Sequence, residues 1–302
     1  MSTETYHIPA LLPETIEALN LQPEGTYVDA TFGGGGHSRA ILDQLGDNGH
    51  LLSFDQDEEA VANAFSDPRF TMIHGNFRFL RNYLRYYRHD SVDGILADLG
   101  VSFHHFDDAE RGFSFRYDGP LDMRMNRRAR NTAARIIADS TEEELERLFR
   151  LYGELKQARR IARAIVAARS EAPVDTVDRL LQATRPLINP RQEKKELAQL
   201  FQALRIEVND EIHALRAFLQ QALQSLRPGG RLAVITYHSL EDRLVKNFMR
   251  TGNLSGDESK DFFGRNLSPM KLLTSKPIVP TDDEIQRNPR SRSAKLRVAV
   301  KL

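Results

Sequence analysis

Residues 26–38 read TYVDATFGGGGHS and decide the fold class. A short apolar strand ends in Asp29, four glycines follow from Gly33 to Gly36, and helical spacing begins at Ser38. Glycine lets the backbone approach a ligand closely, and a helix start offers unpaired N–H groups, so open α/β sheets bind nucleotides at such turns. A flexible surface turn is the alternative, and the turn's position between a buried strand and a helix argues against it.

Strands and helices alternate around this turn through the first hundred residues. Helical spacing at 38–45 and 57–65 separates short apolar runs. Alternation of this length implies a parallel sheet that is covered by helices on both faces. The expected strands are residues 26–30, 49–54, 70–74 and 91–98.

The pattern changes after residue 106. Residues 103–126 lack periodicity and indicate a long ordered loop, and residues 141–183 carry apolar side chains at three- and four-residue steps. We therefore expect an α/β fold in which residues 1–106 and 196–302 form one domain and residues 107–195 form an inserted helical domain.

The sheet is expected to resume after the insertion. One long amphipathic helix is predicted over residues 197–226, followed by a strand at 231–237. Residues 294–300 alternate and predict an edge strand, while the polar stretch 251–289 is expected to be a mobile loop.

Composition sets limits on the function. The 302 residues include 42 basic and 42 acidic side chains, so any positive surface for nucleic acid must be local. Cysteine is absent, which excludes disulfides and thiolate chemistry. No apolar run approaches the length of a membrane span and the N-terminus lacks a signal-peptide pattern, so we expect a cytoplasmic protein without membrane contact.

The glycine turn does not fit the nicotinamide dinucleotide pattern G-x-G-x-x-G, because the sixth position from Gly33 is Ser38. An acid directly before the glycines, here Asp29, is instead typical of turns that bind S-adenosylmethionine. Asp55 lies 22 residues beyond Gly33, where a carboxylate can accept both hydroxyls of a ribose. The alternative for Asp55 is a plain helix N-cap, a role that suits Asp57 better.

Two further residues follow strand ends. Asp98 ends the strand 91–98, and acids at carboxyl ends of parallel strands face the ligand crevice. Phe77 follows the strand 70–74 and is a candidate neighbour of an adenine ring, or else a core residue behind a tight turn.

Arginine and aromatic side chains alternate in the loop RGFSFRYDGPLDMRM, residues 111–125. Such a pattern can hold phosphates and stack bases, whereas the alternative is a packed connector whose charges pair internally. A second basic stretch near residue 290 could contact RNA backbone or be a solvated tail. The candidate substrate contacts are Arg111, Arg116, Asp122, Arg124, Arg290 and Arg292. No metal is expected, since the ligand spacing around His104, His105 and Asp107 is unconvincing.

Blocks spanning nearly the whole chain resemble the MraW/RsmH group of bacterial 16S rRNA cytosine-N4 methyltransferases. They are HIPALL at 7–12, DATFGGGGHS at 29–38, DQD at 55–57, DGILADLGVS at 93–102, DDAERGFSFRYDGPLDMRM at 107–125, FQALRIEVNDE at 201–211, PGGRLAVITYHSLEDRLVK at 228–246 and NPRSRSAKLR at 288–297. The resemblance implies a class I (Rossmann-like) methyltransferase sheet with an inserted helical domain. It also implies S-adenosylmethionine as cofactor and methylation of a cytidine N4 amine in 16S rRNA, within the small ribosomal subunit.

Carried over by motif, the resemblance implies a set of cofactor contacts. One of them is His105, which stands where family members commonly carry Gln. A second departure precedes FQALRI, where Glu196-Leu-Ala-Gln replaces a Pro-Ala-Thr-Arg-like run. The implied contacts are Gly35, Gly36, His37, Asp55, Phe77, Asp98 and His105.

For catalysis, hydrogen-bond acceptors at the amine should raise its nucleophilicity, which makes Asp98 the first candidate. His238 could accept the spare proton, or could be a loop histidine bonded to a neighbouring carboxylate. A non-catalytic ribosome-assembly factor that binds the same cofactor is the alternative function, and a small-molecule methyltransferase is a third. The sequence leaves the oligomeric state open, a homodimer included.

Overall fold

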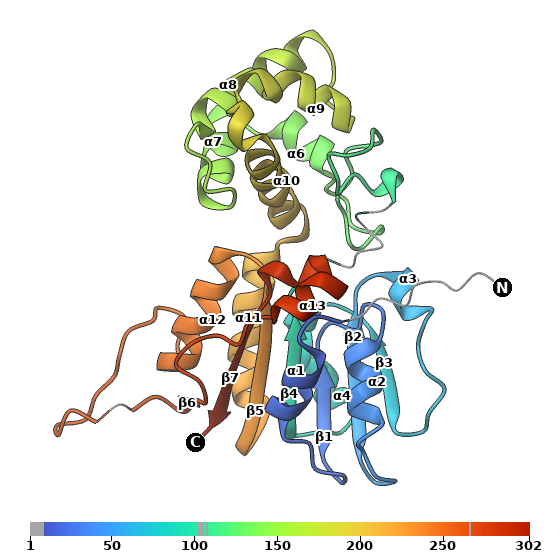
Figure 1. Ribbon diagram of the computed structural model, residues 1–302, viewed down its shortest axis with the longest axis vertical. Coiled ribbons are helices and arrows are strands. Elements are labelled where there is room, and N and C mark those ends of the chain that lie inside the picture. The colour runs from blue at the N-terminus through green and yellow to red at the C-terminus, as the bar shows by residue number, and fades with distance from the viewer. Residues whose placement is uncertain (1–8, 102–105, 107, 266) are drawn as a thin grey trace. The chain divides into compact units, whose positions relative to one another are not determined.

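A computed structural model describes residues 9–101, 106, 108–265 and 267–302 (Figure 1). The chain divides into two compact units. One, called here the α/β unit, comprises Met1–Gly100 and Ile212–Leu302, and the other, the helical unit, comprises Val101–Glu211. The predicted insertion, residues 107–195, lies inside the helical unit, which extends further at both ends.

Within the described residues, seven strands form one sheet in the order β3-β2-β1-β4-β5-β7-β6. The first five in this order are parallel, and β7 is antiparallel to both of its neighbours. The strands are β1 (Thr26–Asp29), β2 (His50–Asp55), β3 (Phe70–His74), β4 (Val92–Asp98), β5 (Leu226–Thr236), β6 (Met270–Leu272) and β7 (Lys295–Lys301).

Helices cover both faces of this sheet. Neighbouring residues of a strand point to opposite faces, so each strand contributes side chains to two cores. Val28 and Ile95 face a core built with α4, α11 and α12, whereas Tyr27 and Leu96 face a core built with α1 and α2 (Figure 1). The predicted class I (Rossmann-like) sheet is confirmed. The helices of the α/β unit are α1 (Leu12–Leu19), α2 (Gly36–Leu42), α3 (Glu58–Val61), α4 (Leu80–Tyr86), α11 (Glu211–Ser225), α12 (Ser239–Thr251) and α13 (Asp282–Arg287).

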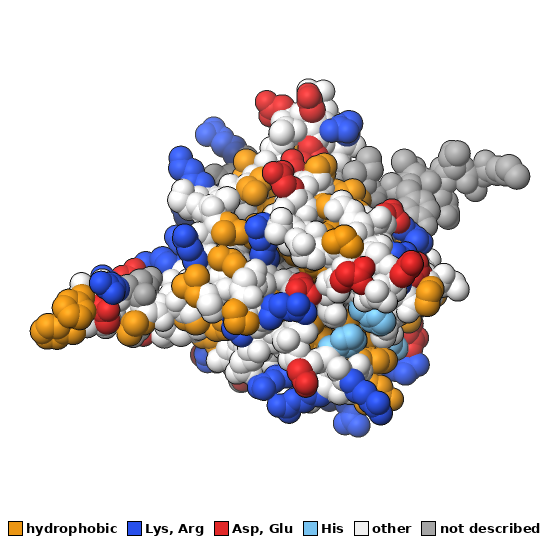
Figure 2. Space-filling view, turned by 90° about the horizontal axis from the view of Figure 1, so that it is seen from below, with side chains coloured by type: hydrophobic (Ala, Val, Ile, Leu, Met, Phe, Trp, Pro, Cys, Tyr) orange, Lys and Arg blue, Asp and Glu red, His pale blue; other side chains and the backbone are white. Residues whose placement is uncertain are grey.

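The C-terminal part differs from the sequence prediction in two ways. Strand β7 is not an edge strand, because β6 pairs with its outer side. In addition, residues 251–289, predicted to be a mobile loop, contain the strand β6 and the helix α13. Between α12 and β6 a segment projects from the unit, and hydrophobic side chains gather at its tip (Figure 2). Phe262 and Phe263 in this segment are 97% and 79% exposed.

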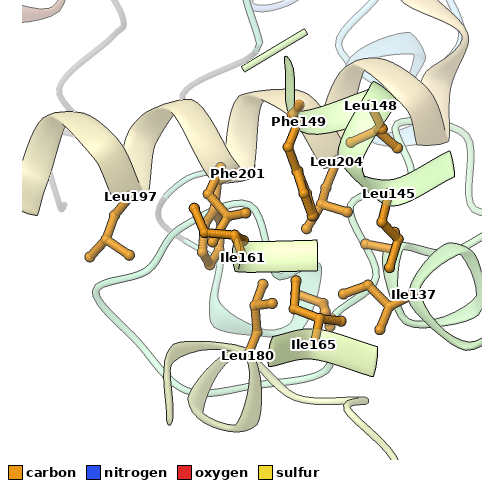
Figure 3. Close-up of a cluster of buried hydrophobic side chains, with 14 of the residues drawn as sticks. Ile137, Leu145, Leu148, Phe149, Ile161, Ile165, Leu180, Leu197, Phe201 and Leu204 are labelled. Atoms are coloured by element: carbon orange, nitrogen blue, oxygen red, sulfur yellow. The ribbon is translucent and has the colours of Figure 1, made fainter. Parts of the chain in front are cut away.

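The helical unit has a core of its own, formed by side chains at helical spacing. Leu197, Phe201 and Leu204 line one side of α10 and meet residues of the other helices, such as Phe149 (Figure 3). Leu200 belongs to the same core. Helix α7 begins with a capping box between Thr141 and Glu144, as the acidic stretch there suggests. The helices are α6 (Ala133–Asp139), α7 (Glu142–Leu151), α8 (Ala158–Glu171), α9 (Val177–Thr184) and α10 (Glu193–Asn209).

The prediction of a single long helix over residues 197–226 is wrong. Helix α10 ends at Asn209, Asp210 adopts a left-handed conformation with φ of 51°, and α11 begins at Glu211. Aspartate tolerates this conformation better than most residues, and the amphipathic period continues across the break, which hides it in the sequence. No helix in the described part of the chain is long and apolar enough to cross a membrane.

Candidate active site

Three carboxylates meet at one edge of the sheet. Asp29, Asp55 and Asp98 each stand at the end of a strand, and β1 pairs in parallel with both β2 and β4. Because parallel strands end on the same side, the register brings all three acids to the carboxyl edge. This is the edge where the glycine turn follows β1.

The glycine turn takes conformations that other residues avoid. Gly33 and Gly35 have φ of 52° and 77°, in the left-handed region. A Cβ on Gly35 would lie 2.8 Å from the Phe32 ring, whereas a Cβ on Gly33 would meet nothing within 4 Å. A Cβ on Gly36 would lie 2.8 Å from the Pro9 ring. The turn is thus closely packed behind Gly35 and open beside Gly33.

Asp55 ties this turn to the next strand. Its Oδ2 accepts the N–H of Gly33 at 2.9 Å, and its Oδ1 accepts the N–H of Asp57 at 2.9 Å. Asp57 is the N-cap of α3, since its side chain accepts the N–H of Glu59. The capping alternative therefore belongs to Asp57, and Asp55 fixes the shape of the turn.

Asp29 is fully buried beneath the turn. It accepts hydrogen bonds from the hydroxyl of Ser38 at 2.6 Å and from the N–H of Thr31 at 3.1 Å. Burial raises the pKa of Asp29 to about 7, against the lowering effect of these bonds. The side chain acts inside the protein, joining β1 to the start of α2.

Asp98 is partly exposed, and one of its carboxyl oxygens lacks a partner in the described part of the chain. Its Oδ1 is buried and has no hydrogen-bond partner among the described residues. Burial raises the pKa of Asp98 to about 7, a hydrogen bond from Tyr237 lowers it, and the charges of Asp29 and Glu241 raise it further. His37, a predicted cofactor contact, lies with Nδ1 3.8 Å from Oδ2 of Asp98.

His238 is the N-cap residue of α12, at the same edge. Its Nε2 lies 3.0 Å from Oε1 of Glu241, one turn into the helix. Neither ring nitrogen of His238 has a hydrogen-bond partner among the described residues, so both the catalytic role and the alternative of a loop histidine bonded to a carboxylate stay predictions. Sequence reasoning missed Tyr237, the residue between β5 and His238, although its place directly after a buried strand was a usable signal.

Two predicted cofactor contacts need separate comment. Phe77 is half-buried and packs edge-on against Phe218, with ring centroids 5.2 Å apart, as a residue at the rim of the core would. His105 lies outside the described residues.

Most of the predicted substrate residues of the helical unit are engaged internally. Arg111 is buried and donates to the carbonyls of Arg124 and Met125 at 3.0 and 3.2 Å. Arg124 forms a two-pronged pair with Asp122 at 2.8 and 2.6 Å. Burial raises the pKa of Asp122, but the hydrogen bonds from Arg124 outweigh this effect and bring the pKa below its ordinary value. Arg116 is exposed, so the loop is a packed connector that presents one arginine to solvent.

The basic stretch near residue 290, in the α/β unit, also contains both exposed and internally paired arginines. Arg290 and Arg292 are exposed on a short 3₁₀ turn, Pro289–Ser293. Arg297 is buried on β7 and pairs with both oxygens of Asp242 at 2.6 and 3.1 Å.

The sheet and its acidic carboxyl edge define a class I methyltransferase. The chain belongs to the MraW methylase family, which it matches over residues 4–302. It is 59% identical over 297 residues to the ribosomal RNA small subunit methyltransferase H of Bacteroides fragilis, covering 98% of each chain.

The protein of the same name from Porphyromonas gingivalis is 55% identical over 302 residues, covering 98% of this chain and 97% of that one. A solved structure of a putative rRNA methylase from Clostridium thermocellum is 13% identical with a TM-score of 0.45, covering 98% of this chain and 100% of that one.

Proposed function

We propose that this protein transfers a methyl group from S-adenosylmethionine to the exocyclic N4 amine of a cytidine in 16S rRNA of the small ribosomal subunit. Membership of a methylase family and relatives named as small-subunit rRNA methyltransferases support the reaction class and the substrate. A substrate of this kind would place the protein with the ribosomes in the cytoplasm. The observation that carries the chemistry is Oδ1 of Asp98, a buried acceptor without a partner among the described residues, at the edge where the glycine turn opens.

The residues at this edge fit the cofactor. Open space beside Gly33 leaves room for a ligand against the backbone, and Asp55 is anchored where it can also accept ribose hydroxyls. A carboxylate oxygen has two lone pairs, so the bonds to Gly33 and Asp57 do not exhaust Asp55. Gly35, Gly36, His37, Phe77 and His105 remain proposed neighbours of the cofactor.

When bound, S-adenosylmethionine supplies a methyl group on a positively charged sulfur. The amine nitrogen would take this methyl group in place of the sulfur and would lose one proton. The protein must align the amine and accept hydrogen bonds from its N–H groups, which raises the nucleophilicity of the nitrogen. Asp98 would do this by accepting an N–H of the amine, and His238, which lies beside Glu241, is the second candidate for receiving the proton.

Exposed basic side chains would hold the RNA. Arg116 with the half-exposed Tyr117 offers a phosphate contact next to a stacking surface, and Arg290 and Arg292 offer a second basic surface. Arg111, Asp122 and Arg124 keep the connector in shape and act on the substrate only through it.

The experiment that tests this function offers methyl-labelled cofactor together with undermethylated small subunits, free rRNA or a metabolite extract. We expect label in the RNA of the subunits or in free rRNA. Label in metabolites alone would indicate a small-molecule enzyme. Cofactor binding without transfer to any of the three would indicate an assembly factor, and either result would contradict the proposal.

A further inference from the structure

Three side chains of the kind that binds metal ions meet where α11 and α12 begin. Glu211 is the first residue of α11, His238 is the N-cap residue of α12, and Glu241 lies one turn into α12. Each offers one ligand atom, a ring nitrogen or a carboxylate oxygen, and these three atoms lie within 4.8 Å of one another. The residues are distant in the sequence, so their spacing gives no local signal of a site.

The packing of α11 and α12 places this cluster. Glu211 closes the range of the helical unit, but every other residue of α11 belongs to the α/β unit. Leu215 of α11 and Val245 of α12 are buried in the same core. The starts of both helices are therefore fixed relative to each other by contacts inside the α/β unit.

His238 is the buried member of the cluster whose nitrogens need a partner. Its side chain is 9% exposed, and neither ring nitrogen has a hydrogen-bond partner among the described residues. Nε2 lies 3.0 Å from Oε1 of Glu241, but the two atoms are not aligned for a hydrogen bond. Leaving a buried nitrogen without a partner costs free energy. A shared metal ion would satisfy both atoms, because two ligand atoms on one ion lie side by side without pointing at each other.

The separation of these two atoms suits a common ion. Ligand atoms about 2.1 Å from an ion lie roughly 3.0 to 3.4 Å apart at right or tetrahedral angles. The distance of 3.0 Å between Nε2 of His238 and Oε1 of Glu241 falls in this range. A rotation of the Glu211 side chain would bring its oxygen to the same separation.

Both carboxylates are held in place and keep capacity for a cation. Oε2 of Glu241, whose side chain is 4% exposed, accepts the N–H of Tyr237 at 3.1 Å. Glu211, 15% exposed, accepts from Nε and Nη2 of Arg205 at 2.9 and 3.0 Å. Each carboxylate oxygen has two lone pairs, so these bonds do not exhaust either group. Two largely buried negative charges beside a histidine ring favour a bound cation.

We propose that Glu211, His238 and Glu241 bind one divalent transition-metal ion, for which Zn²⁺ is the best match. Imidazole and carboxylate ligands suit zinc, and two carboxylates with a neutral histidine balance its charge. An ion on Nε2 of His238 takes the lone pair that a proton would need, so it leaves Asp98 as the proton acceptor of the proposed function. Zinc binding is measured without methyl transfer, so the failure of one proposal is distinguishable from the failure of the other.

The test is a calorimetric titration of the full chain with zinc chloride, after metal has been removed with a chelator. The wild type should bind Zn²⁺ with a Kd of about 1 μM or below, and His238→Asn should weaken this binding by at least about a hundredfold. The matched control is His89→Asn, a half-buried histidine at the amino edge of the sheet that packs against His50, and it should keep the wild-type Kd. Absence of zinc binding in the wild type, or equal Kd values for the wild type and His238→Asn, would overturn the site.

Two further measurements guard against a variant that fails to fold. Glu211→Gln keeps the shape of the side chain and removes its charge, and should weaken zinc binding by about tenfold. An unchanged Kd would reject Glu211 as a ligand. In the wild type, paramagnetic Mn²⁺, which accepts the same ligand atoms, should broaden the ring resonances of His238 and leave those of His89 sharp. Broadening at His89 without broadening at His238 would place the ion elsewhere and contradict the proposal.

Discussion

The backbone N–H of Gly33 donates to Oδ2 of Asp55 over 2.9 Å, and so joins the glycine turn after β1 to the end of β2. One carboxylate thus shapes the turn from a neighbouring strand. In the proposed function the same side chain also accepts the ribose hydroxyls, so the shape of the turn and cofactor binding would depend on one group.

Replacement of Asp55 by Asn should weaken S-adenosylmethionine binding by about tenfold, because the amide keeps one acceptor oxygen and loses the charge that strengthens its bonds. Asp57→Asn is the matched control, since asparagine caps helices as well as aspartate does. Its Kd should stay within about twofold of the wild type. Equal Kd values for the two variants in a calorimetric titration would contradict the assignment of Asp55.

The two glycines of the turn should respond differently to alanine. Gly35→Ala forces a Cβ to 2.8 Å from the Phe32 ring and 2.9 Å from the Phe65 ring, and these rings pack on each other. It should lower the free energy of unfolding by about 2–4 kcal/mol. Gly33→Ala carries only backbone strain, about 1–2 kcal/mol, but its methyl group enters the open space. Urea unfolding should therefore rank Gly35→Ala as the less stable variant, while Gly33→Ala should still lose cofactor affinity. Unimpaired binding by Gly33→Ala would mean that the cofactor lies elsewhere.

The free energy of unfolding should fall as the pH rises towards 7, because Asp29 and Asp98 at the carboxyl edge are harder to ionise in the folded state than in the unfolded state. The pKa values of Asp29 and Asp98 are raised to about 7, so between about pH 4 and 7 the folded state holds protons that the unfolded state has lost. Each group then reduces the free energy of unfolding by up to roughly 1.4 kcal/mol per pH unit, and the effect levels off above pH 7. Asp98→Asn removes one of these groups, so denaturant unfolding of the variant between pH 5 and 7 should show a shallower decline. Identical slopes would contradict the raised pKa of Asp98.

Substitutions of Arg116 and Arg124, both in the connector of residues 111–125, should separate an effect on RNA binding from an effect on packing. Arg116 is exposed, so Arg116→Ala should leave stability unchanged and reduce the salt dependence of RNA binding by about one unit of slope. Arg124→Ala breaks the pair with Asp122 and bonds to the carbonyls of Arg127 and Ala129, and should cost about 1–3 kcal/mol of stability. Filter-binding titrations at several salt concentrations, together with thermal unfolding, distinguish the two. The reverse pattern would make Arg124 the RNA contact.

Local patterns in the sequence predict the sheet well. Strands β1 to β4 follow from short apolar runs next to glycines and acids, and their ends place Asp55 and Asp98 correctly at the carboxyl edge. These runs are apolar almost without interruption, as expected for strands that are covered on both faces, and Tyr27 and Val28 enter different cores because neighbouring side chains point to opposite sides.

What the sequence does not predict depends on contacts between distant segments. The break at Asp210 keeps the helical period, and the pairing of β6 with β7 gives no local signal because β6 is three residues long. Burial of Arg111 likewise arises only when the connector folds, since arginine in a basic loop otherwise suggests exposure.

The central claim is methyl transfer to a cytidine amine with Asp98 as acceptor. Its most direct test incubates undermethylated small subunits with methyl-labelled S-adenosylmethionine and the wild type or Asp98→Asn, digests the RNA, and analyses the nucleosides by mass spectrometry. The account predicts label on N4 of a single cytidine with the wild type, and a rate at least about a hundredfold lower with Asp98→Asn. Label on another atom or nucleoside, or an undiminished rate with Asp98→Asn, would contradict it.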